Sequence, residues 1–139
     1  MKRAEQKGFS LIELLVVVTV IGIIAAVAIP AFRKGIWAAE NGSAFSAMRT
    51  IASTQVNFFS QRNRFARLTE LQPMLGNSLG TTAGETVVKG SYVFELDPST
   101  TADSDLATRY IITARRSVPG DITYKYELTQ TGEIVQLLP

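Results

Sequence analysis

The feature that most constrains this chain is an apolar run from Leu14 to Phe32, which directly follows the hexapeptide Gly-Phe-Ser-Leu-Ile-Glu at residues 8–13. Between Phe9 and Phe32, Glu13 carries the one ionisable side chain. With the residues before it, the run reaches about 20 residues or more, which is enough for a helix to span a bilayer. A carboxylate in such a segment is energetically expensive, so Glu13 is a candidate functional residue.

Composition narrows the classes of function. The 139 residues include no cysteine and no histidine. This excludes disulfides, thiol nucleophiles, Cys-based zinc sites and histidine general bases. The sequence also lacks a Gly-rich phosphate-binding loop of the P-loop type. We therefore expect a chain that is not an enzyme and that uses no cofactor.

The positive charge of the chain is concentrated at its N-terminus. Lys2, Arg3 and Lys7 against Glu5 account for the whole net charge of +2. The remainder is balanced, so the basic pI does not indicate a nucleic-acid partner. A basic head before an apolar segment favours a cytoplasmic N-terminus and an outward-facing body.

Two simpler interpretations of the apolar run are an ordinary signal anchor and a cleaved secretory signal peptide. Ala26-Val27-Ala28 does fit the A-x-A pattern of a cleavage site. However, a secretory apolar region is usually about 7–15 residues long and contains no carboxylate. A plain anchor explains neither Glu13 nor the abrupt boundary between Gly8 and Phe9, so we favour neither interpretation.

Residues 7–15 (Lys-Gly-Phe-Ser-Leu-Ile-Glu-Leu-Leu) and residues 22–30 (Gly-Ile-Ile-Ala-Ala-Val-Ala-Ile-Pro) resemble the N-terminus of type IV pilins and of type II secretion pseudopilins. Residues 47–71 are similar, less specifically, to the helix end and first loop of bacterial type IVa pilins. The resemblance implies that a prepilin peptidase cuts between Gly8 and Phe9 and that the new amine of Phe9 is N-methylated. Residues 1–8 would then be a leader peptide that is removed on maturation.

The resemblance also implies a role for Glu13 in assembly. Glu13 lies four residues after Phe9, so both lie on the same helix face, about one turn apart. In an isolated subunit the apolar run offers Glu13 no cation. When such helices pack with an axial shift, the Phe9 ammonium of one subunit can meet Glu13 of another. Such a pair would set the register of a homo-oligomeric filament more than its net stability.

Gly22 and Pro30 bracket the second half of the apolar run. Pro30 cannot donate to the helix ladder, and Gly22 is a weak helix former. The residues alone leave two interpretations open, a modest kink in a buried helix and a segment that unwinds when a filament stretches. The family resemblance favours the second.

After Arg33, apolar residues recur at three- and four-residue steps, which predicts an amphipathic helix with one buried stripe. We expect one helix from about Phe9 to Gln61, which would be ~80 Å long. The expected stripe consists of Trp37, Phe45, Met48, Ala52, Gln55 or Val56, and Phe59.

The remainder predicts a loop and a sheet. Residues 61–90 predict a long connection with one short helical turn at Thr69–Leu75. Alternating runs separated by turn residues predict an antiparallel meander that the amphipathic half of the helix covers. The predicted fold class is therefore α+β, with a transmembrane and assembly helix at 9–32 and a globular head at 33–139. The expected strands, about four, are 91–96, 109–115, 122–129 and 133–138.

Two groups of charged residues are weaker candidates for binding sites. Asp97, Asp103 and Asp105 could contribute to a calcium site, but their spacing is not that of an EF-hand. We therefore predict no metal and favour a solvated acidic loop. Two arginine clusters could contact DNA phosphates. We favour contacts of these arginines with other subunits or with solvent, and we leave nucleic-acid binding open. The cluster residues are Arg62, Arg64, Arg67, Arg115 and Arg116.

The favoured function is a structural subunit of a type IV pilus. The expected partners are the prepilin peptidase/methyltransferase, the inner-membrane pilus assembly machinery and other copies of the chain. The precursor would cross the inner membrane once and then enter an extracellular filament. One alternative is a periplasmic pseudopilin of a type II secretion system, and another is a minor pilin. The missing C-terminal cysteine pair slightly favours these two alternatives. A membrane-anchored binding module or enzyme is a third hypothesis.

Overall fold

The computed structural model describes residues 8–76, 78–116 and 123–138. The chain divides into two compact units, Met1–Ala38 and Ala39–Pro139. Helix α1 (Leu11–Arg62) contributes to both, and its bounds agree closely with the expected helix from Phe9 to Gln61.

The N-terminal unit consists of the apolar part of α1. The most apolar 18-residue window of this helix contains no buried residue, and the helix is long and apolar enough to cross a membrane. The large apolar side chains from Phe9 to Phe32 are all exposed within the chain itself. A helix that is apolar on every side needs lipid or other helices around it.

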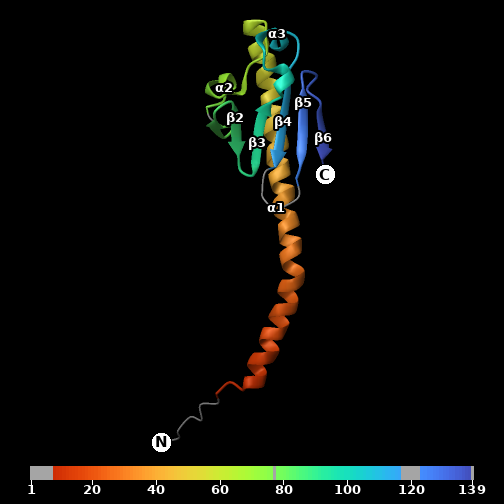
Figure 1. Ribbon diagram of the computed structural model, residues 1–139. Helices are drawn as coiled ribbons and strands as arrows, with labels where there is room; N and C mark the ends of the chain where they lie inside the picture. Colours follow the sequence, from red (N-terminus) through yellow and green to blue (C-terminus); the bar gives the residue numbers. More distant parts are fainter. Residues whose placement is uncertain (1–7, 77, 117–122, 139) are drawn as a thin grey trace, which may run out of the picture. The chain divides into compact units, whose positions relative to one another are not determined.

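The C-terminal unit packs the second half of α1 against one face of a six-stranded antiparallel sheet (Figure 1). The strands follow one another in chain order, as expected for a meander. They are β1 (Thr81–Ala83), β2 (Thr86–Lys89), β3 (Tyr92–Leu96), β4 (Ile111–Arg116), β5 (Lys125–Thr129) and β6 (Ile134–Leu138). The short helices are α2 (Leu68–Leu71), η1 (Pro73–Leu75), η2 (Pro98–Thr100) and α3 (Asp103–Leu106).

Strand register brings large and small side chains together under the helix. Phe94 of β3 lies opposite Ala114 of β4, which lies opposite Tyr126 of β5. All three are buried. The small Ala114 leaves room between two rings, and Phe45 of α1 meets Tyr126 edge-on with ring centroids 5.7 Å apart. The fold class predicted from the alternating pattern, α+β, is confirmed.

The buried stripe of α1 differs in part from the predicted one. Met48 and Gln55 are buried as expected, and Phe45 and Ala52 pack at the edge of the core. Val56, however, is 65% exposed, so its inclusion in the stripe is wrong. The stripe follows the helical period through Gln55, which turns Val56 away from the sheet. The buried residues are Ala44, Ala47, Met48, Ile51, Thr54 and Gln55.

The prediction of a long loop over residues 61–90 is wrong in its second part. Strands β1 and β2 form a hairpin there, which raises the number of strands from four to six. At the start of the hairpin Gly80 has a φ of +133°, and a Cβ on it would lie 2.2 Å from the Val88 carbonyl oxygen. A glycine is therefore required at this position. Ile122, the predicted first residue of β5, lies outside the described residues.

Candidate functional site

The start of α1 gives the Glu13 carboxylate a partner within its own chain. Because the helix begins at Leu11, Ser10 is its N-cap and Glu13 its third residue. The Ser10 N–H donates to Glu13 Oε2 at 2.9 Å. This bond is one half of a capping box, and it places a negative charge at the positive end of the helix dipole. The S-x-x-E pattern at residues 10–13 carried this signal, which our sequence analysis missed.

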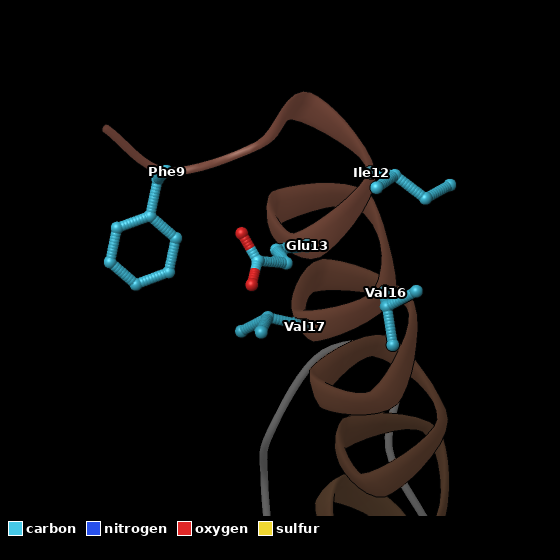
Figure 2. A pocket seen from close by; sticks show the side chains of 5 residues that line it. All are labelled: Phe9, Ile12, Glu13, Val16 and Val17. Carbon is cyan, nitrogen blue, oxygen red and sulfur yellow. The ribbon is translucent and has the colours of Figure 1, made fainter. Parts of the chain in front are cut away.

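The surroundings of this carboxylate are apolar. A groove at the helix start is lined by Phe9, Ile12, Glu13, Val16 and Val17. Figure 2 shows the Phe9 ring and the Glu13 carboxylate on the same side of the helix start, with Val17 one turn further along. Phe9 itself is 86% exposed. The site is thus one acidic group on an otherwise apolar, uncovered surface.

Gly22 and Pro30 both lie inside continuous helix. Among the described residues, and apart from its neighbours and the nearby backbone of its own helix, no atom lies within 4 Å of a Cβ placed on Gly22, so packing there does not explain a glycine. Pro30 has no N–H for the carbonyl of Ala26, one turn earlier, which removes one helical hydrogen bond. The structure thus places both residues in the exposed apolar helix without a break at either.

Two of the three aspartates of the weak calcium prediction bind other partners within the chain. Asp97 caps η2 by accepting from the Ser99 N–H at 2.9 Å and the Ser99 hydroxyl at 2.7 Å. These hydrogen bonds hold the pKa of Asp97 below its usual value. Asp103 pairs with Arg67 Nη1 at 2.9 Å, and Asp105 lies in the same helix, α3. Across the described part of the chain, no three His, Cys, Asp or Glu residues are grouped to hold a metal ion.

Three arginines of the two basic clusters pair within the chain, which corrects the preference for subunit or solvent contacts. Arg64 binds Glu70, with Nη2 2.5 Å from Oε1, and Arg67 binds Asp103. Arg116 binds Glu40, and the Arg116 side chain is only 3% exposed. Sequence reasoning could not find these pairs because the partners come from distant segments. Arg62 and Arg115 are exposed.

Comparison with known proteins shows which proteins share these features. The model of the prokaryotic N-terminal methylation motif matches residues 3–29. The chain is 27% identical over 145 residues to the type IV major alpha-pilin of Moraxella bovis, covering 92% of this chain and 90% of that protein. It is 39% identical over 77 residues to the type IV major pilin protein PilA of Myxococcus xanthus strain DK1622. The chain is thus similar to type IV major pilins, and its N-terminus carries the prokaryotic N-terminal methylation motif.

The extent of similarity differs between these pilins. The match to the Myxococcus protein covers 53% of this chain and 35% of that protein. The type IV major pilin protein PilE1 of Neisseria gonorrhoeae is 30% identical, over 66% of this chain and 52% of that protein. The chain thus spans about half or less of the length of these two relatives. Among solved structures, none matches it significantly. The matched motif contains Gly8, Phe9, Glu13 and Gly22, and Pro30 follows it directly.

Proposed function

We propose that this chain is a structural subunit of a type IV pilus that polymerises through its N-terminal helix. The observation that carries the proposal is the exposed apolar helix with one carboxylate at its start, inside a methylation motif. The role is structural rather than enzymatic. The relatives named above are major pilins, and none of them is a pseudopilin.

The exposed helix explains why the subunit needs two environments. Burying one Val, Leu, Ile or Phe side chain away from water is worth about 1.5–3 kcal/mol. More than ten such side chains between Phe9 and Phe32 are exposed in the isolated chain. A bilayer covers them in the precursor, and neighbouring helices cover them in a filament. The precursor is therefore held in the inner membrane by one span, with its N-terminus in the cytoplasm, until the assembly machinery moves it into an extracellular pilus.

Cleavage between Gly8 and Phe9 completes the site. It removes the leader of residues 1–8 and creates an ammonium group on Phe9, which the prepilin peptidase/methyltransferase then methylates. Ser10, whose N–H binds the Glu13 carboxylate, directly follows Phe9 in the chain. The new ammonium charge on Phe9 therefore arises beside that carboxylate. In the filament, Glu13 pairs with the Phe9 ammonium of another subunit and so fixes the axial register of the helices. The segment from Gly22 to Pro30 is the part of the helix that can unwind under tension.

Substitution of Glu13 tests this function. Cells that lack the wild-type gene are complemented with the wild type, Glu13→Ala or Glu13→Gln. Glu13→Gln keeps an oxygen that can accept from Ser10 and removes only the charge. We expect both variants to be cleaved after Gly8. We expect the filament yield of both variants to fall about tenfold or more, because a loss of about 1.4 kcal/mol of assembly free energy per subunit changes an equilibrium tenfold. The yield is measured by electron microscopy and on material sheared from the cells.

Glu85→Gln is the matched control, because Glu85 lies exposed in the turn between β1 and β2. It should leave the filament yield unchanged. A normal yield of filaments from Glu13→Gln would contradict the proposed role of the charge. Absence of filaments from wild-type cells that express the chain would contradict the proposed function itself.

A further inference from the structure

A basic and aromatic surface lies where the apolar part of α1 ends. A groove there is lined by Ile29, Pro30, Arg33, Lys34 and Trp37. The last four follow the i, i+3, i+4, i+7 spacing and so share one helix face. The cationic residues Arg33 and Lys34 are both exposed, and within the described residues neither of them forms an ion pair. We call this set of five residues the basic groove.

A second groove meets the basic groove at Arg33. It is lined by Ala28, Ile29, Phe32 and Arg33, so Ile29 and Arg33 line both. Arg33 thus lines two grooves whose other residues are mostly apolar. This arrangement matches a ligand that carries an anionic group and apolar chains in the same molecule.

The spacing along the helix places this surface at a membrane interface. Arg33 lies twenty residues after Glu13, which is about 30 Å of helix at 1.5 Å per residue. The hydrocarbon core of a bilayer is also about 30 Å thick. When Glu13 lies at one edge of the hydrocarbon, Arg33 therefore lies at the other, at the level of the phosphate groups. An indole at the position of Trp37 suits the same interface.

We propose that Arg33 and Lys34 bind the phosphate of an anionic phospholipid, with its acyl chains in the two grooves. The inference rests on the proposed membrane-held precursor. A guanidinium group binds phosphate through two parallel N–H donors, and the lysine ammonium adds a second charge. Cations at the translocated end of a span oppose the usual orientation rule, and an anionic headgroup neutralises them there. A zwitterionic lipid carries no net charge and therefore cannot neutralise the two cations.

Trp37 provides the measurement, because it is the one tryptophan in the chain. The full chain is reconstituted in phosphatidylcholine vesicles that contain a small fraction of dibrominated phosphatidylglycerol or dibrominated phosphatidylcholine. Bromine quenches the fluorescence of a nearby indole, so the ratio of quenching reports which lipid is enriched beside Trp37. We expect phosphatidylglycerol to be enriched about fivefold or more, the gain expected of one cation near an anionic surface.

The double variant Arg33→Gln/Lys34→Gln should lower this ratio to about one. Arg115→Gln/Lys125→Gln removes the same charge from paired positions on β4 and β5 and should keep the enrichment. Equal quenching by the two lipids in the wild type, or retention of the preference by the first double variant, would overturn the lipid proposal alone. Absence of quenching by either lipid would overturn both this proposal and the membrane-held precursor on which it rests.

Discussion

Arg116 of β4 and Glu40 of α1 form an ion pair in which Nε and Nη2 both lie 2.9 Å from one carboxylate oxygen, Oε2. The Ser91 hydroxyl donates to the other oxygen, Oε1, at 2.6 Å. Beside this pair, the Tyr92 hydroxyl donates to Asn41 Oδ1 at 2.5 Å. Two consecutive helix residues are thus bonded to Ser91, which directly precedes β3, and to Tyr92, the first residue of β3. These contacts fix where the helix lies along the sheet within the C-terminal unit.

Removal of Glu40 should destabilise the head strongly. Glu40→Ala removes a carboxylate that the buried Arg116 binds through Nε and Nη2, which should lower the free energy of unfolding by about 3 kcal/mol. Denaturant unfolding of the detergent-solubilised chain measures this. The double variant Glu40→Met/Arg116→Met should recover part of the loss, because it removes both charges. A loss below about 0.5 kcal/mol for Glu40→Ala, the level of an ordinary surface change, would contradict the assigned role.

Gln55 holds the segment after α1 in place. Its Nε2 donates to the Ala66 carbonyl at 2.8 Å, and its Oε1 accepts from the Ala66 N–H at 2.7 Å. Both residues are fully buried. Gln55→Leu leaves two buried backbone groups unpaired and should lower the free energy of unfolding by about 3 kcal/mol. Val56→Ala, at an exposed neighbouring position, is the control and should change it little; equal effects of the two would refute the assignment.

The ion pair between Arg64 and Glu70 should make stability depend on pH. Hydrogen bonds from Arg64 hold the pKa of Glu70 below its ordinary value. The stabilisation is therefore present above the unfolded-state pKa and is lost as pH falls through the lower folded-state value. Between about pH 6 and pH 3 the wild type should lose about 1 kcal/mol more than Glu70→Gln, a typical magnitude for a partly exposed pair. Glu85→Gln should follow the wild type, and identical pH profiles for all three proteins would argue against the pair.

Pro30→Ala should stiffen the proposed extensible segment. The new N–H can donate to the Ala26 carbonyl, and alanine is about 3 kcal/mol more favourable than proline inside a helix. Single filaments of the variant should therefore extend less than the wild type at the same force in an optical trap. Val20→Ala, outside residues 22–30 in the same helix, serves as the control. Equal extension of the two variants would remove the basis for assigning extensibility to this segment.

The parts of the fold that periodicity encodes could be predicted from the sequence. The long helix buries residues at helical spacing, and buried positions alternate along β3 and β5. Strand β1 shows no alternation, since all three of its residues are exposed. Hairpin β1–β2 was therefore missed. The hydrophobic pattern could not decide whether Gln55 or Val56 is the buried residue. It does not show that a buried amide can bind the backbone of Ala66.

The candidate site was predictable to a similar degree. The position of Glu13 in the apolar run was visible in the sequence, and so was its capping pattern with Ser10, although we did not use it. The pair between Glu40 and Arg116 joins residues that are 76 positions apart. No local pattern encodes such a contact, because it depends on the register of the sheet against the helix.

We propose that this chain is processed after Gly8 and becomes the subunit of a surface filament. Mass spectrometry of filaments sheared from cells tests it most directly, because it reports the identity of the subunit and its first residue together. We expect filaments built of this chain, with each copy beginning at an N-methylated Phe9. Filaments that lack the chain, or copies that begin at Met1 or after Ala28, would contradict it.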